Sequence, residues 1–168
     1  EALINAVKSG KQVYAFIEVK ARFDEEANLR WGEQLEKAGI VVRYSFPGLK
    51  VHSKLALVRR LEPDGPQLYS YLSTGNFHEV TARIYSDQGL FTSDKRITSE
   101  VARIFSFLET VKLPSEEFKH LLVGQFNLRK TLIQLIDFEI AEASAGRVAS
   151  ITLKINSLQD EEMIEKLY

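Results

Sequence analysis

The stretch from Gln12 to Phe46 constrains the fold most, because an amphipathic helical pattern separates two apolar strand patterns. The strand patterns cover residues 12–19 and 40–46. Asp24 can cap the helix between them, and Gly39 ends it. The expected apolar face of that helix consists of Ala27, Trp31, Leu35 and Ala38. Strand, helix and strand in this order indicate a right-handed parallel crossover, so the sequence predicts an α/β fold.

The remaining patterns predict a hairpin followed by helices. A polar turn at 63–66 separates two apolar runs, which is typical of an antiparallel pair of strands. A short helix should precede the first strand and end at Gly10. The other expected elements are strands at 49–58, 67–73, 83–92 and 150–156, and helices at 2–7, from Ser93 or Asp94 to before Pro114, at 125–145, and from near Ser157 to Tyr168. We expect the apolar stripes of the two long helices to form core.

Composition narrows the class of protein. The chain has 168 residues, 45% of them hydrophobic, and a formal net charge of -1, which argues against generic electrostatic binding of nucleic acid. Cysteine is absent, which excludes disulfides and thiolate chemistry and fits a reducing compartment. We find no apolar run of about 18 residues and no signal-peptide pattern. We therefore expect a soluble protein with a cytoplasmic location.

His52 and Lys54 form the first candidate site. In a strand at 49–58 they would share one face, because side chains alternate between the two faces of a strand. An imidazole and an ammonium side by side need polar partners when buried, and a bound phosphate would supply them. His52 could then attack phosphorus while Lys54 binds the charged oxygens. The alternative is an ordinary surface strand.

The return strand leads into Gly75 and Asn76, which form the second candidate element. Glycine allows close approach of the backbone to a ligand, and the Asn76 amide can donate to a phosphate oxygen. A simple tight turn is the alternative interpretation. His78 and His120 are interpreted as surface residues. The acidic side chains at 24–26 are interpreted as the first turn of a helix rather than as a metal site.

Three segments in register, 20–28, 47–54 and 73–77, resemble the signature segments of bacterial polyphosphate kinases of the type phosphorylated on histidine. The similarity extends to 81–85 and 151–156. The resemblance implies a phospholipase D-like mixed β-sheet flanked by helices. It assigns residues 1–146 to the first catalytic lobe and 147–168 to the truncated beginning of a second. A helix that reaches Tyr168 without a stop signal fits a fragment of a longer protein.

The resemblance also implies a reaction and its site residues. The reaction is reversible transfer of the terminal phosphoryl group of ATP to inorganic polyphosphate through a phosphohistidine on His52, with Lys54 and Asn76 as further catalytic residues. Tyr85, Lys54 and Arg22 are expected to bind ATP or phosphate. Arg22 also matches a Mg2+ site position, but a guanidinium has no free lone pair, so it should act through phosphate or metal-bound water.

The implied partners are ATP, ADP and polyphosphate, with no nucleic acid. We expect a homo-oligomeric full-length enzyme and a site that only the second lobe completes. Any peripheral contact of that enzyme with a membrane would involve regions outside this chain. The isolated chain should therefore be inactive. Two rivals stay open: a phospholipase D-like phosphodiesterase or nuclease, and a non-catalytic assembly lobe. Arg59 occupies the position where the superfamily usually has an aspartate, which disfavours the phosphodiesterase.

Overall fold

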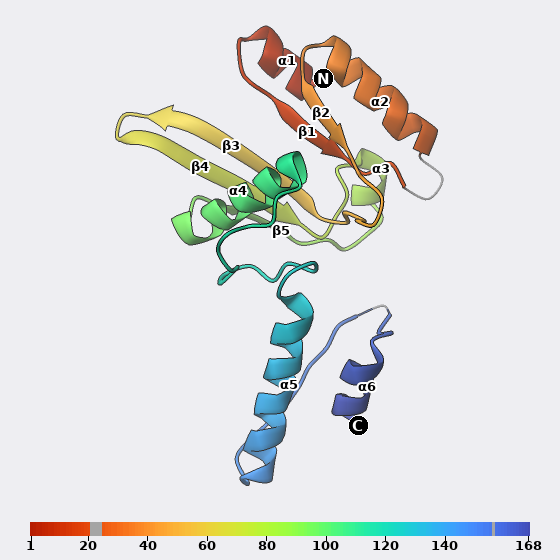
Figure 1. Cartoon of the computed structure of the whole chain (residues 1–168), viewed down its shortest axis with the longest axis vertical. Helices are drawn as coiled ribbons and strands as arrows, with labels where there is room; N and C mark the ends of the chain where they lie inside the picture. Colours follow the sequence, from red (N-terminus) through yellow and green to blue (C-terminus); the bar gives the residue numbers. More distant parts are fainter. Residues whose placement is uncertain (21–24, 156) are drawn as a thin grey trace. The chain divides into compact units, whose positions relative to one another are not determined.

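The structure is a computed structural model and describes residues 1–20, 25–155 and 157–168 (Figure 1). The chain forms two compact units, residues 1–115 and 116–168. The first unit contains β1 to β5 and α1 to α4, and the second contains α5 and α6. The mixed α/β class predicted from the sequence is confirmed, whereas the predicted lobe boundary after Gly146 stays a prediction.

The first unit begins with a parallel strand, helix and strand arrangement. After α1 (Ala2–Lys8), β1 (Tyr14–Ile17) pairs in parallel with β2 (Val41–Tyr44), and α2 (Glu25–Lys37) lies between them in the chain. The predicted crossover is therefore present, with strands shorter than the apolar runs. Because both strands are parallel, their carboxyl ends lie at the same edge of this sheet.

The contact between α2 and β2 depends on a glycine. Gly32 is the residue of α2 that is buried, and a Cβ placed there would lie 2.3 Å from the Tyr44 hydroxyl. Trp31, by contrast, is 55% exposed. The prediction that Trp31 belongs to the packed face is therefore wrong, because the aromatic ring at this contact comes from the strand and needs the space that a glycine leaves.

The second sheet has three antiparallel strands in the order β3-β4-β5. β3 (Lys54–Glu62) and β4 (Gly65–Ser73) form the predicted hairpin, and β5 (Gly89–Thr92) pairs with the end of β4. Gly65 has φ +113°, a conformation that favours glycine at this tight turn. β3 begins at Lys54, so the predicted strand start at Leu49 is wrong.

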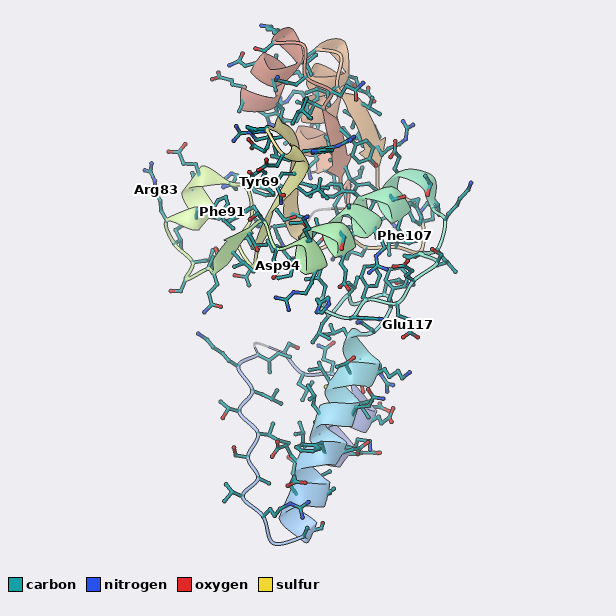
Figure 2. All side chains as sticks on the ribbon, turned by 90° about the vertical axis from the view of Figure 1, so that its left-hand side faces the viewer. Tyr69, Arg83, Phe91, Asp94, Phe107 and Glu117 are labelled. Atoms are coloured by element: carbon teal, nitrogen blue, oxygen red, sulfur yellow. The ribbon has the colours of Figure 1, made fainter. Side chains whose placement is uncertain are left out.

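Helix α4 (Lys95–Thr110) contacts β3 and β4 and supplies much of the core. Its predicted cap is confirmed: the Asp94 carboxylate accepts the Arg96 N–H at 2.9 Å, and Figure 2 shows Asp94 at the start of the helix. Val101 is fully buried. Among the residues of this unit that the structure describes, the buried hydrophobic ones are Ile40, Val42, Val101, Phe107 and Leu108.

The predicted strand at 83–92 is wrong over its first part. Residues 83–88 instead follow a short helix, α3 (Glu79–Ala82), which His78 Nδ1 caps by accepting the Thr81 N–H at 3.3 Å. Residues 83–88 are exposed and irregular. Only β5 remains as strand, and its Gly89 lies under the Tyr71 ring, where a Cβ would approach ring atoms to 2.8 Å.

In the described part of the second unit the regular elements are two helices, α5 (Leu128–Ser144) and α6 (Glu161–Leu167). They are joined by an ion pair of 2.6 Å between Arg129 and Asp160. Asp160 also caps α6 by accepting the Met163 N–H at 3.0 Å, so the predicted start near Ser157 is corrected to Asp160.

Two expectations for this unit are wrong. Residues 150–155 are not a strand, and Asn156 lies outside the described residues. Of the predicted apolar stripe of α5 only Ile136 is buried, whereas Leu135 and Ile140 are exposed. Along the described ranges, no helix combines the length and the apolar character that crossing a membrane requires.

Candidate phosphate-binding site

His52 lies in the irregular segment 49–53 that leads into β3. Gly48 precedes this segment with φ +89°, which turns the chain after Pro47. The imidazole is exposed, and its Nε2 lies 3.2 Å from Lys54 Nζ. The same ammonium donates to the His52 carbonyl oxygen at 2.7 Å. The predicted proximity of the two side chains is thus present, although His52 precedes the strand and does not lie on a strand face.

Glu18 holds the loop that carries His52. It follows β1, and its Oε2 accepts the Val51 N–H at 2.8 Å. Its Oε1 accepts the Ser45 hydroxyl at 2.8 Å and the Lys20 N–H at 2.9 Å. Ser45 follows β2, and its Oγ accepts the Val19 N–H at 3.1 Å. One carboxylate therefore connects the carboxyl ends of both parallel strands to the residue before His52.

These contacts determine the ionisation of Glu18. Partial burial acts to raise its pKa, but the hydrogen bonds from Val51, Ser45 and Lys20 outweigh burial and lower the pKa below its ordinary value. The Lys50 charge acts in the same direction. Sequence reasoning missed Glu18. The available signal was a carboxylate at the carboxyl end of an apolar strand in an α/β unit, where ligand sites usually lie.

The Gly75–Asn76 element lies at the same end of the hairpin as Lys54, because Lys54 pairs with Ser73 across β3 and β4. The turn is joined to the chain before β5: Thr74 Oγ1 accepts the Gln88 N–H at 3.0 Å and donates to Asp87 at 3.3 Å. Asn76 is exposed. The predicted convergence of the His52 loop and the Gly75 turn on one end of the hairpin is therefore present.

Asp87 adjoins the Gly75 turn and acts electrostatically on Lys54. A Cβ added to Gly75 would approach its carboxylate to 2.4 Å, so a larger residue in the turn would force the Asp87 side chain to shift. Asp87 also acts on Lys54: burial lowers the pKa of Lys54, and the Asp87 charge acts to raise it. Asp87 is a second residue near the site that the sequence did not reveal, because 33 positions separate it from Lys54 in the chain.

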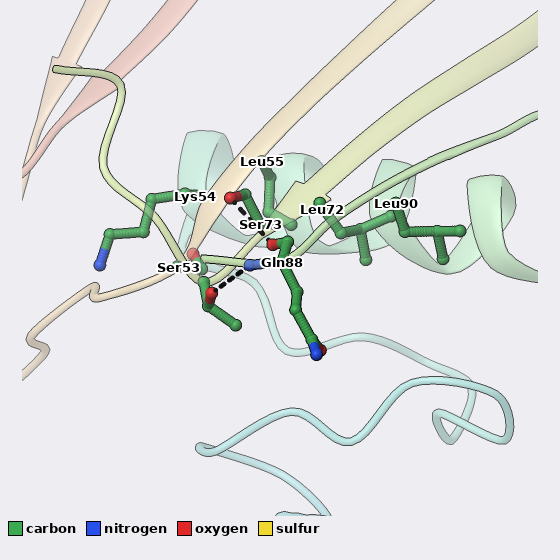
Figure 3. Close-up of a pocket in the computed structure, with 9 residues that line it drawn as sticks. Ser53, Lys54, Leu55, Leu72, Ser73, Gln88 and Leu90 are labelled. Atoms are coloured by element: carbon green, nitrogen blue, oxygen red, sulfur yellow. Dashed lines mark hydrogen bonds between the residues drawn. The ribbon is translucent and has the colours of Figure 1, made fainter. Parts of the chain in front are cut away.

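An open hollow of about 620 Å³ adjoins Lys54 (Figure 3). Leu55, Leu72 and Leu90 form a row across its floor, one from each strand of the sheet. Figure 3 shows the Lys54 side chain extending away from these leucines, while Ser73 is hydrogen bonded to the Gln88 carbonyl oxygen at 3.2 Å. The charged end of Lys54 thus points toward His52 and not into the apolar floor.

Tyr85 and Arg22 complete the set of predicted site residues. Tyr85 is not on a strand; it follows α3 and is 66% exposed, so its ring and hydroxyl are accessible. Tyr85 therefore does not belong to a strand, although the predicted strand 83–92 includes it. Arg22 lies outside the described residues, and its role stays a prediction. Within the described ranges, no three His, Asp or Glu side chains group in a way that could hold a metal ion.

Comparison with known proteins defines the class to which this fold and site belong. Residues 1–114 match the family model "Polyphosphate kinase C-terminal domain 1", and residues 121–168 match "Polyphosphate kinase C-terminal domain 2". The chain therefore belongs to the polyphosphate kinase family.

Particular relatives support this assignment. The chain is 49% identical to the polyphosphate kinase of Yersinia pestis and 45% identical to that of Escherichia coli K12, in each case over all of this chain and 24% of the relative. A crystal structure of polyphosphate kinase from Porphyromonas gingivalis matches 99% of this chain and 28% of its own, with 45% identity and a TM-score of 0.84. The chain spans about a quarter of the length of these relatives.

Proposed function

We propose that this chain is part of an enzyme that reversibly transfers the terminal phosphoryl group of ATP to inorganic polyphosphate through a phosphohistidine on His52. The observation that carries the proposal is the exposed imidazole of His52 with the Lys54 ammonium 3.2 Å from its Nε2. Membership of the polyphosphate kinase family supports the substrates, since relatives with that name match this chain from end to end.

The chemistry follows from these groups. An unprotonated ring nitrogen of His52 attacks the γ-phosphorus, the bond from that phosphorus to the bridging oxygen breaks, and ADP leaves with the electron pair. A terminal oxygen of polyphosphate then attacks the same phosphorus, and the P–N bond breaks. Charge on the transferred group is spread over its equatorial oxygens, so a nearby ammonium such as Lys54 stabilises the transition state.

Asn76, Tyr85 and Arg22 are assigned supporting roles. The exposed Asn76 amide can donate to a phosphate oxygen, and the exposed Tyr85 offers a ring face and a hydroxyl to ATP. Arg22 is proposed to bind phosphate or metal-bound water. We propose that Mg2+ enters with ATP, bound to its phosphates. Its chemistry there would be neutralisation of phosphate charge.

The test is labelling of the full-length protein with ATP carrying 32P at the γ-position. We expect an acid-labile label that mass spectrometry assigns to His52. His52→Ala should abolish the label and leave the circular dichroism spectrum unchanged, because the side chain is exposed. His78→Asn is the matched control: asparagine can still accept the Thr81 N–H, so this helix cap survives while another exposed imidazole is removed.

Other outcomes would assign a different function. Cleavage of a phosphodiester without nucleotide would favour a phospholipase D-like hydrolase. Phosphate binding without any label on His52 would favour a non-catalytic lobe. Equal labelling of the wild type and His52→Ala would refute His52 as the acceptor.

A further inference from the structure

The Glu18 carboxylate receives donors from three separate segments of the chain. Its oxygens accept from Lys20 after β1, from Ser45 after β2 and from Val51 before β3. All of these contacts are 2.8 to 2.9 Å long. Hydrogen bonds to an ionised acceptor are shorter and stronger than neutral ones, so this carboxylate is a firm attachment point for each segment.

The attachment of Val51 matters most, because His52 is the next residue. Segment 49–53 belongs to no helix or strand, so no ladder of backbone bonds holds it. Its Val51 N–H is bonded to Glu18, and the His52 carbonyl oxygen accepts from Lys54 at 2.7 Å. The backbone that carries the imidazole is therefore held on both sides, once by Glu18 and once by Lys54.

We propose that Glu18 is a positioning residue for His52: its carboxylate holds the Val51 amide and thereby sets where the imidazole stands. Glu18 does not touch the reacting phosphorus in this proposal. The inference rests on the proposed function, since it assigns Glu18 a role in phosphorylation of His52. Glu18 is not needed to join the ends of β1 and β2, because the Ser45 backbone N–H already donates to the Ile17 carbonyl oxygen at 2.9 Å. The role proposed for Glu18 is therefore more than structural support.

Glu18→Gln in the full-length protein tests the proposal. Glutamine keeps the shape but replaces one acceptor oxygen by an NH2 group, and faster hydrogen exchange at Val51 identifies the orientation in which this NH2 group faces the Val51 N–H. We expect the rate of His52 labelling at saturating ATP to fall about 100-fold, because even a small misplacement of a reacting group can lower the rate by about this factor. The ATP concentration for half-maximal rate should change by less than about twofold, because ground-state binding is not the contact that is lost.

Two controls separate positioning from general stability. Ser45→Ala removes another donor to Glu18 but leaves the Val51 bond, so its labelling rate should stay within about twofold of the wild type. Glu62→Gln changes a carboxylate at the far end of the hairpin, where it accepts from the Tyr69 hydroxyl at 3.0 Å, and should have no effect on the labelling rate. Hydrogen exchange of the peptide that contains Val51 should accelerate in Glu18→Gln alone.

The outcomes are distinct. Faster exchange at Val51 with an unchanged labelling rate would overturn the proposal. So would a Glu18→Gln protein that fails to fold, or equal loss of rate in Glu18→Gln and Ser45→Ala, because each would show a purely structural brace. Absence of label on His52 in the wild type would refute the proposed function instead, and the exchange measurement would still report whether Glu18 holds Val51.

Discussion

Lys54 is the cation whose position next to His52 is established, with Nζ 3.2 Å from the imidazole. Replacing it by methionine keeps most of the aliphatic stem and removes the charge. We expect Lys54→Met to lower the rate of His52 labelling in the full-length protein by about 100-fold, the usual effect of removing one group that stabilises transition-state charge. Rapid-quench labelling with γ-32P ATP measures this rate.

Arg59→Met is the matched control for Lys54→Met. Arg59 is exposed on the same strand, opposite Leu68, and has no assigned contact with the His52 loop. A loss of rate as large in Arg59→Met as in Lys54→Met would show that general positive charge near the hairpin, and not the ammonium beside the imidazole, governs the reaction.

The ionisation of Glu18 predicts a local effect of pH. The pKa of Glu18 is lowered in the folded protein, so the hydrogen bonds to its carboxylate stabilise the fold above its ordinary value of 4.5. This contribution is lost as the pH falls below that value and through the lowered pKa. We expect the hydrogen-exchange protection factor of the Val51 amide, measured by NMR, to decrease in that window.

Leu57 provides the internal reference for this measurement. It lies inside the β3–β4 ladder opposite Ser70, so its environment does not depend on Glu18. Val51 should lose protection at a higher pH than Leu57. Simultaneous loss at both positions would mean that acid unfolds the sheet as a whole and that Glu18 does not titrate locally.

Single residues of the site were predictable from the sequence where they belong to a short motif. His52, Lys54 and the Gly75–Asn76 pair lie within a few positions of one another or at matching ends of a hairpin, and the structure brings their elements together. Glu18 and Asp87 were not predictable in this way. Their contacts to Val51 and Thr74 exist only after distant segments have packed.

At the scale of elements, the contact of α2 with β2 gives a stability prediction. Gly32→Ala raises helix propensity by about 1 kcal/mol. The new Cβ, however, would lie 2.3 to 2.9 Å from the hydroxyl and ring carbons of Tyr44, so the ring must move. Overpacking of this kind costs about 1 to 3 kcal/mol, and we expect a net loss of stability. Urea unfolding followed by circular dichroism measures it.

Gly124→Ala is the control for Gly32→Ala. No atom lies within 4 Å of a Cβ added at Gly124, so its free energy of unfolding should change by less than about 0.5 kcal/mol. If Gly32→Ala were more stable than the wild type, the Tyr44 ring would have moved aside without a loss of free energy. The close contact would then not determine how α2 packs.

The errors of sequence interpretation at this scale have physical causes. An alternating apolar pattern forms a strand only where a neighbouring strand is available for pairing. Residues 150–155 have this pattern, but the described part of their unit contains helices and no strand with which they could pair. Residues 83–88 follow a short helix that His78 caps, a local hydrogen bond that periodicity does not register, and they stay irregular. Helices with a cap, such as α4, were predicted well because the cap is local.

At the scale of the whole molecule, the composition of the site predicts how the isolated chain behaves. ATP and polyphosphate carry several negative charges, and phosphoryl transfer depends on cations that surround the transferred group. Lys54 is the cation established beside His52 here, and the chain corresponds to 24% of its Yersinia pestis relative. We therefore expect the isolated 168-residue chain to show little or no phosphoryl transfer.

The measurement compares the isolated chain with the full-length protein at equal molar concentration, by formation of 32P-labelled polyphosphate from ATP. Circular dichroism of the isolated chain serves as the control for folding, since an unfolded chain would be inactive for a trivial reason. A folded but inactive chain would mean that groups outside these 168 residues complete the site around His52. Full activity of the isolated chain would show that Lys54, Asn76 and the Glu18-held loop suffice, and the two-lobe site would have to be abandoned.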